Sequence, residues 1–328
     1  MISKVDCFQD VHLHASSVRE WRQTYSQISA GPLQSSLAQI TTERCHVFRE
    51  QINQRIVQQG EAPRGKVCFA VPLAVPGAAR VQGREADDKC IFVLQGGDEF
   101  MFHMPTGTDI LSITFDREEF DRALSCTLWP TGISALLRQP VVQVPVHRLV
   151  ESRSRLLALF DAALARPELV ATPEAERQLE QAMLGELLRL VADPGCDRNQ
   201  RHGSSSRSFI VEKCHRLTVE NAASAPSVVD LCQRLRVSRR TVQNSFQSVT
   251  ATNPVNYIRS IRLNGARREL MTTTSADVSI GDAAAQWGFF HLSHFAAEYQ
   301  QLFGELPSQT RRGAGAIGRP AASLAMAA

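Results

Sequence analysis

The stretch SVVDLCQRLRVSRRTVQNSFQSV, residues 227–249, decides how the C-terminal part of the chain folds. Its first half predicts a short helix beginning after Ser227, because its apolar residues recur at helical spacing. The chain then turns, and Ser238 is a good N-cap for a second helix. Helix, three-residue turn and helix together predict a helix-turn-helix unit over residues 228–249.

The outward face of this second helix carries residue types that can read DNA. Burial of Val242 and Phe246, four residues apart, leaves four polar side chains facing outward. In the major groove Arg can bond guanine, and Gln or Asn can bond adenine. An ordinary solvated helix surface explains the same residues, and taken alone that interpretation is favoured. The candidate DNA-binding residues are Arg239, Arg240, Gln243 and Asn244.

A second segment of the same kind favours the DNA-reading interpretation. Residues 279–303 predict another helix-turn-helix unit, with Gly288 at its turn and Phe295 and Tyr299 buried four residues apart. Between the units, residues 256–271 predict one long helix with an apolar side and an arginine-rich side. We call the two helix-turn-helix units, residues 228–249 and 279–303, the first and the second reader. If the readers lie about 34 Å apart, they enter successive major grooves of the DNA. The outward candidates of the second reader are His291, Leu292, Ser293 and His294.

The two units share an ordered set of residues with a known family of proteins. The first half of the set is Leu231-Cys232, Val237-Ser238-Arg239-Arg240-Thr241-Val242, Phe246, Pro254-Val255-Asn256-Tyr257-Ile258, Arg262-Leu263, Ala266 and Leu270. The second half is Ser279-Ile280, Gly288-Phe289, Ser293-His294-Phe295, Tyr299, Phe303-Gly304, Pro307-Ser308 and Arg311. In these residues the chain resembles the AraC/XylS family of bacterial transcription regulators.

The resemblance implies an all-helical DNA-binding module over about residues 208–312, roughly a third of the chain, with recognition helices at about 239–249 and 292–303. It further implies that the protein binds double-stranded DNA, influences RNA polymerase, and more often activates than represses. The expected function is therefore a sequence-specific transcriptional regulator, an effector-responsive activator.

The chain departs from the family pattern at three positions. Ala251 stands where Gly usually precedes the long helix, so this turn is expected to differ. Ala297 and Gln300 stand where the family often has cationic residues, and their loss weakens attraction to phosphates. We therefore expect the first reader to dominate DNA affinity. Candidates for phosphate contact are Arg259, Arg262 and Arg311, for which ion pairs within the protein are an equally good explanation.

The N-terminal part predicts a different architecture. Between residues 67 and 115, short alternating segments separated by Gly and Pro predict five strands. Two amphipathic helices follow, over about 149–164 and 172–190, and pack on the strands or on a second subunit. The expected fold class is α+β: a small N-terminal β-barrel or sandwich with two following helices, a linker, and a C-terminal all-α domain with two helix-turn-helix units.

This division predicts four segments, which differ in composition and charge. Residues 1–193 carry 20 Lys and Arg against 24 Asp and Glu, whereas residues 208–312 carry 12 against 8. The formal net charge of +3 thus hides an acidic front and a basic back, which favours DNA binding by the latter. The segments are an effector-sensing and dimerisation domain (1–193), a linker (194–207), the DNA-binding domain (208–312) and a disordered tail (313–328).

The function of the N-terminal domain is less sharply indicated. Residues 67–120 are distantly similar to the front part of ethanolamine-operon regulators, which implies an unidentified small-molecule effector. The aromatic residues Phe69, Phe92, Phe100 and Phe102 either line a pocket or form an ordinary core, and the core is favoured. Whether the chain forms a homodimer stays open.

The competing class is a metal-dependent small-barrel enzyme fused to a DNA-binding module. Such barrels need clustered His and Glu, but the one HxH, His12-Leu13-His14, precedes the expected strands and His103 stands alone. A DNA-repair branch of the family uses a reactive and metal-bound Cys, whereas the eight cysteines here include no CxxC pair. We therefore expect no catalytic residues, no metal site and no cofactor. The chain lacks an evident signal peptide or membrane segment, so we expect a cytoplasmic protein.

Overall fold

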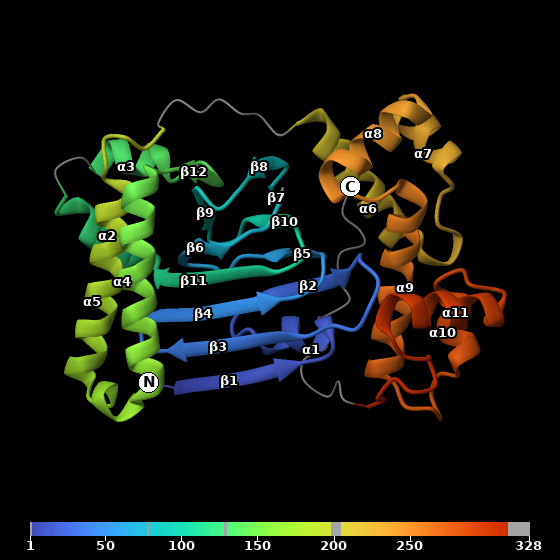
Figure 1. Ribbon diagram of the computed structural model, residues 1–328, viewed down its shortest axis with the longest axis horizontal. Helices are drawn as coiled ribbons and strands as arrows, with labels where there is room; N and C mark the ends of the chain where they lie inside the picture. Colours follow the sequence, from blue (N-terminus) through green and yellow to red (C-terminus); the bar gives the residue numbers. More distant parts are fainter. Residues whose placement is uncertain (1, 78, 128–129, 198–204, 314–328) are drawn as a thin grey trace.

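The computed structural model describes residues 2–77, 79–127, 130–197 and 205–313. Two sheets with covering helices form the N-terminal part, and the C-terminal part is entirely helical (Figure 1). The expected α+β class is confirmed, although the two sheets do not close into a barrel. Half of the predicted linker, residues 198–204, and the predicted tail from residue 314 onward lie outside the described residues.

The described strands form two antiparallel sheets. The seven-stranded sheet has the order β1 (Ile2–Phe8), β3 (Ser35–Thr41), β4 (Cys45–Ile52), β11 (Thr108–Asp116), β6 (Lys66–Ala74), β9 (Cys90–Gln95) and β12 (Val141–Gln143). The five-stranded sheet has the order β2 (Arg22–Gln27), β5 (Ile56–Glu61), β10 (Glu99–Met104), β7 (Ala79–Val81) and β8 (Arg84–Ala86). The sequence pattern predicted five strands between residues 67 and 115, and it did not predict the strands before residue 62. Polar residues in these earlier strands interrupt the alternation of apolar ones.

Both faces of the larger sheet are buried at its central strands, where successive residues point to opposite faces. In β6, Val67, Phe69 and Val71 pack toward the helices, whereas Cys68 packs toward the smaller sheet. The two faces of β9 divide in the same way, with Val93 on the helix side. This double burial explains why residues 90–94 form a continuous apolar run rather than an alternating one.

Helices cover the outer face of the larger sheet. They are α2 (Arg117–Ser125), α3 (Pro130–Leu136), α4 (Val146–Ala165) and α5 (Pro173–Val191), with a short 3-10 turn at Pro167–Val170 (Figure 1). In α4, Leu149, Leu156 and Phe160 are buried in the core that the sheet shares with α5. The apolar stripes of these two helices thus pack within the chain. Thr172 caps α5 by accepting a hydrogen bond from the Ala175 amide.

The C-terminal part has two small cores on one shared helix. Its helices are α6 (Ser206–Glu220), α7 (Val228–Leu235), α8 (Arg239–Thr250), α9 (Pro254–Thr272), α10 (Ile280–Gln286) and α11 (Leu292–Phe303), with a 3-10 turn at Ala222–Ser224. Val242, Phe246 and Tyr257 belong to the first core, and Phe295 and Tyr299 to the second. Because α9 contributes to both cores, the two helix-turn-helix units are joined through one helix.

The middle of α9 is hydrogen-bonded to the N-terminal part. The Asn264 Oδ1 accepts from the Gln27 amide at 2.9 Å, and its Nδ2 donates to the Gln27 carbonyl at 2.8 Å. The Gln27 Nε2 and the Gly31 amide both donate to the Leu302 carbonyl, at 2.8 and 3.1 Å. Strand β2 is therefore tied to both α9 and the end of α11.

A buried arginine of α9 completes this contact. Arg267 pairs with Asp10, the N-cap of α1 (Val11–Ser17), at 2.5 Å and with Glu305 at 2.7 Å. Burial opposes its charge, but Asp10, Tyr299 and Glu305 together outweigh burial and raise the pKa of Arg267. Next to it, the Arg268 Nε donates to the His12 Nε2 at 3.0 Å. Burial, and then the Arg268 charge, lower the pKa of His12 to about 4, so this ring stays neutral and accepts.

A second contact joins β10 to the first helix-turn-helix unit through a tyrosine. The Tyr257 hydroxyl lies 3.2 Å from the His103 Nε2 and 2.9 Å from the His215 Nδ1. Burial is the main cause that lowers the pKa of His103 to about 3 and of His215 to about 4. The nearby Arg80 acts on His103 in the same direction. Both rings are thus neutral in the folded protein.

Acidification is expected to destabilise the chain through these histidines. Their folded pKa values lie below the usual 6.5, so between pH 6.5 and about 4 the unfolded chain binds more protons and unfolding becomes easier. One such group changes the free energy of unfolding by up to about 1.4 kcal/mol per pH unit. His103→Gln should reduce the slope measured by urea unfolding between pH 6.5 and 4.5. The exposed His294→Gln is the control, and equal slopes in both variants would contradict the assignment.

The turn before α9 adopts the left-handed conformation without a glycine. Ala251 has φ 51°, in an exposed position where L residues are strained by about 1 kcal/mol. Ala251→Gly should therefore increase the free energy of unfolding by about 1 kcal/mol in urea titrations. The matched control, Ala297→Gly at an exposed site within α11, should lower it by a similar amount. A loss of stability in both variants would refute the strain.

Candidate nucleic-acid interface

The first reader helix, α8, is positioned by capping on both sides of its turn. Ser227 and Asp230 form a capping box at the start of α7. Arg236 ends α7 in the left-handed conformation, with φ 54°. The Ser238 Oγ then accepts from the Thr241 amide at 3.1 Å, which starts α8. These local signals fix the direction in which α8 leaves the turn.

The outward face of α8 agrees with the periodicity of its sequence. Val242 and Phe246 are fully buried, and the four predicted DNA-binding residues are all exposed. Within the part of the chain that the structure describes, neither Arg239 nor Arg240 has an ion-pair partner, so both charges are available to an external anion. The four residues are Arg239, Arg240, Gln243 and Asn244.

The turn and the helix before it add exposed residues that the periodicity did not single out. Arg234, in the last turn of α7, and the left-handed Arg236 are both exposed and positively charged. Gln247 continues the outward row of α8 one turn beyond Gln243. The positive charge around the first reader is therefore larger than Arg239 and Arg240 alone suggest.

The second reader helix, α11, presents a different surface. His291, Leu292, Ser293 and His294 are all exposed at its start, as predicted from the pattern. Leu292 is 51% exposed and its neighbour Phe290 is 74% exposed, which the sequence pattern did not single out. Residues 290–303 contain no Lys or Arg. This end therefore offers apolar and neutral polar groups, which suit thymine methyl groups and base edges better than phosphates.

The three candidate phosphate-binding arginines lie in different surroundings. Arg259 pairs with Glu298 of α11 at 3.1 Å. The Arg262 Nε donates to the Trp287 carbonyl at 2.7 Å, and its guanidinium lies over the Phe289 ring. Both thus hold the second unit against α9.

Arg311 is exposed, but it lines an open cleft between the N-terminal sheet and α9. The position of Arg311 and the internal partners of the other two arginines leave contact with DNA untested. Phosphate contact by Arg259, Arg262 and Arg311 stays a prediction.

The histidines of the HxH motif lie in α1 and have separate partners. His12 accepts from Arg268, whereas the His14 Nε2 lies 3.0 Å from Glu50 and its Nδ1 lies 2.8 Å from Ser35. Among residues 2–77, 79–127, 130–197 and 205–313, no three His, Cys, Asp or Glu side chains gather as a metal site. Within those same ranges, no helix combines the length and the apolarity that crossing a membrane requires.

The helical C-terminal part of the chain is similar to a known protein family. Residues 231–313 match the family described as a helix-turn-helix domain. The chain is 27% identical over 63% of its length to the probable thc operon regulatory protein of Rhodococcus erythropolis, covering 62% of that protein. It is 38% identical over 28% of its length to the XylDLEGF operon transcriptional activator 2 of Pseudomonas putida, covering 58% of it. The chain thus spans less than two thirds of each relative.

Among solved structures, the AraC-like transcriptional activator CuxR aligns with 88% of this chain and 100% of its own. The TM-score is 0.40 and the sequence identity is 13%.

The unequal charge of the two readers gives a direct prediction about DNA affinity. Arg240→Ala should weaken binding more than His294→Ala, because a bidentate arginine contact contributes about 1–3 kcal/mol. Affinity is measured by fluorescence anisotropy on a duplex that the full chain selects from a random library. Arg240→Ala should also flatten the dependence of affinity on salt if its contact is to phosphate. Equal losses, or a larger loss for His294→Ala, would contradict the prediction.

Proposed function

We propose that this chain is a transcriptional regulator of the AraC/XylS family that binds double-stranded DNA, responds to a small-molecule effector and activates transcription in the cytoplasm. The observation that carries the proposal is the pair of outward reader helices, α8 and α11, joined through α9. The matched helix-turn-helix domain and the similarity to an operon activator support it. RNA polymerase is the partner through which a bound activator acts.

The length of α9 supports binding of both readers to one DNA molecule. Its 19 residues span about 28 Å at 1.5 Å per residue. This length is close to the helical repeat of B-DNA, about 34 Å, which separates successive major grooves on one face. The first core takes residues from the N-terminal half of α9 and the second core from its C-terminal half, so the two readers are held at different positions along one helix.

The proposed division of labour between the readers follows from their side chains. Arg239, Arg240, Gln243 and Asn244 bind base edges and neighbouring phosphates, and so supply most of the affinity. His291, Leu292, Ser293 and His294 read bases with little electrostatic attraction. Arg259, Arg262 and Arg311 are the proposed phosphate contacts, and Arg259 and Arg262 also hold the second unit against α9.

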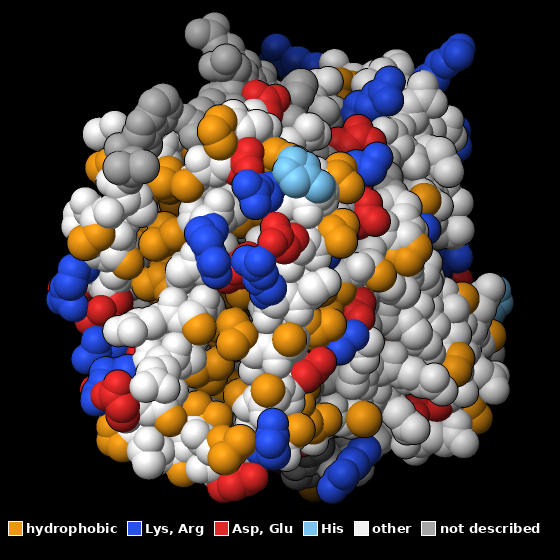
Figure 2. All heavy atoms as spheres, turned by 60° about the vertical axis from the view of Figure 1, so that its left-hand side comes forward, with side chains coloured by type: hydrophobic (Ala, Val, Ile, Leu, Met, Phe, Trp, Pro, Cys, Tyr) orange, Lys and Arg blue, Asp and Glu red, His pale blue; other side chains and the backbone are white. Residues whose placement is uncertain are grey.

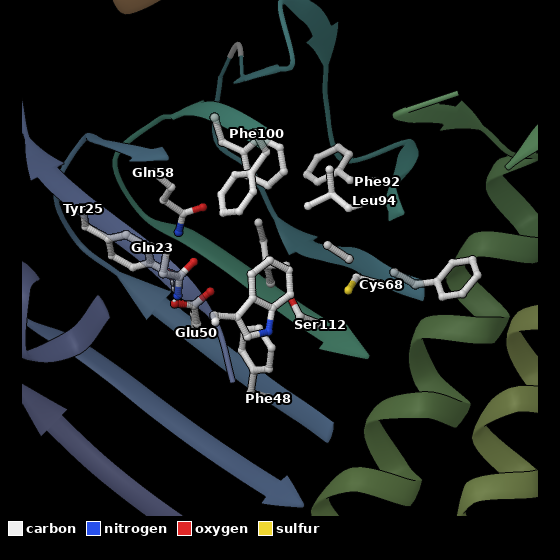
Figure 3. A pocket seen from close by; sticks show the side chains of 15 residues that line it. Gln23, Tyr25, Phe48, Glu50, Gln58, Cys68, Phe92, Leu94, Phe100 and Ser112 are labelled. Atoms are coloured by element: carbon white, nitrogen blue, oxygen red, sulfur yellow. Dashed lines mark hydrogen bonds between the residues drawn. The ribbon is translucent and has the colours of Figure 1, made fainter. Parts of the chain in front are cut away.

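Two structural links support control of the readers by the N-terminal part. A cavity lies between the two sheets, and Tyr25 of β2 lines it two residues before Gln27, which is bonded to Asn264 (Figure 3). Helix α1 forms the second link, since His14 contacts Glu50 at the cavity and Asp10 contacts Arg267. An effector in this cavity would shift the equilibrium only by binding two arrangements of these links with different affinity.

A homodimer is proposed through the helices that cover the larger sheet. Figure 2 turns this side forward and shows apolar side chains lying between charged ones on its surface. On α4 and the following turn, Val146, Val150 and Leu169 are each more than half exposed. A second copy would bury them. The distant similarity of residues 67–120 to ethanolamine-operon regulators leaves the identity of the effector open.

Mapping of bound DNA tests the proposed function. Chromatin immunoprecipitation with the full chain should recover discrete promoter sites. DNase footprints on them should show two protected patches about 10.5 base pairs apart on one face. The double variant Arg239→Ala, Arg240→Ala should lose these sites, whereas the control Arg122→Ala, on the exposed side of α2, should keep them. Binding unaffected by the double variant, or a single short footprint, would refute the assignment of two readers.

A further inference from the structure

The cavity between the sheets is built mainly from aromatic rings. Phe48, Phe92, Phe100 and Phe102 surround it, and Trp21 contacts two of them edge-on, with ring centroids 5.9 Å from Phe48 and 5.6 Å from Phe100. Figure 3 shows side chains from opposite sheets converging on this space. Phe69 also borders it, although its ring packs against Phe120 on the helix side. An occupant must therefore be largely apolar.

Two donors at this cavity are shielded from solvent and make no hydrogen bond of ordinary geometry within the protein. They are the Trp21 Nε1 and the Gln23 Nε2, of which Gln23 lies close enough to the Tyr25 hydroxyl to interact with it. The two residues stand two apart at the start of β2, so both side chains lie on its cavity side. A buried N–H without a partner is destabilising, and an acceptor brought by a ligand would remove this cost. The donors thus call for a ligand with a hydrogen-bond acceptor.

A carboxylate that lines the cavity from the larger sheet restricts the charge of the ligand. The Glu50 Oε1 accepts from the Tyr25 hydroxyl at 2.6 Å and lies 3.0 Å from the His14 Nε2. The lining residues include no Lys or Arg, so a ligand anion would meet Glu50 without a cation to balance it. A ligand cation would compete with His14 and leave the two donors unpaired. Both arguments favour an uncharged ligand.

We propose that this cavity is the effector site and binds a small, uncharged, largely apolar molecule whose acceptor bonds Trp21 and Gln23. The regulatory role of the ligand rests on the proposed function, whereas its binding to the cavity does not, because binding is measurable without DNA. The free volume is about 40 Å³, so the cavity must widen to admit a ring. Because Trp21 lines the cavity, binding changes the surroundings of its indole.

Three probes of equal shape separate the possible charges: benzamide is neutral, benzoate is an anion and benzamidine is a cation. With the purified full chain, benzamide should give a saturable change in tryptophan fluorescence, and both ions should bind at least about tenfold more weakly. Acetophenone, which is neutral and offers only an acceptor, should behave like benzamide. No binding by either neutral probe, or tighter binding by either ion, would overturn the proposal.

Variants locate the site, with affinity measured by calorimetry because one of them removes the fluorescent reporter. Trp21→Phe keeps the ring but removes its N–H, and should weaken benzamide binding about tenfold. Gln23→Leu should do the same, so one misfolded variant leaves the other informative. Thr24→Ser, on the opposite face of β2, is the matched control and should bind normally. Unchanged affinity in both cavity variants would refute this site.

A charge variant tests the role of Glu50. Glu50→Gln should bring the affinities of benzoate and benzamide to within about tenfold of each other, and an undiminished preference would count against exclusion of anions by Glu50. Affinity of each variant for a selected duplex is measured separately. If the unaltered chain binds benzamide but binds no DNA duplex, the result argues against the proposed function and leaves the cavity proposal standing.

Discussion

The buried charge of Arg267 is the constraint on which the arrangement of the molecule depends. A guanidinium inside a protein is costly unless it is paired, and here one partner comes from each side of the domain contact. Asp10 belongs to the N-terminal part and Glu305 to the end of the second helix-turn-helix unit. Separation of the two parts would return Arg267 to water with half of its pairing lost. The docked position of α9 is thus specified by charge as well as by shape.

The same helix gives the two readers a common frame. Residues early in α9 complete the first core and residues late in it complete the second, while Asn264 faces β2 between them. Movement of β2 would therefore shift both readers together, because both are attached to α9. This differs from a freely tethered DNA-binding module, since Ile28, Val57 and Met101 of the sheets pack directly into the first helical core.

Much of the helical part could be predicted because its signals are local. Ser227 and Ser238 cap the helices that they precede, and the spacing of Val242 and Phe246 decides which side of α8 faces out. The strands before residue 62 were less predictable. Their side chains include buried polar residues such as Gln27, Gln39 and Glu50, whose partners come from distant segments, so alternation of apolar residues is lost.

The arginines of α9 show the limit of pattern analysis for the candidate site. In sequence, Arg259, Arg262, Arg267 and Arg268 form one basic stripe that looks suited to phosphates. In the fold, they bond Glu298, the Trp287 carbonyl, Asp10 and His12, respectively. The readers, by contrast, carry their exposed residues where periodicity placed them. Near the first reader, Arg234, Arg236, Arg239 and Arg240 are all exposed.

The sequence by itself determined the two helix-turn-helix units, their outward residues and the α+β class, because caps and helical periodicity act over a few residues. Only the tertiary structure decided that α9 docks on the sheets, that four arginines have internal partners, and that two unpaired donors border an aromatic cavity. The docking of α9 joins residues more than two hundred positions apart, as in the pair of Asp10 with Arg267, and the cavity is lined by residues from seven strands or their borders. No local spacing encodes such a contact, since it arises from the packing of whole elements.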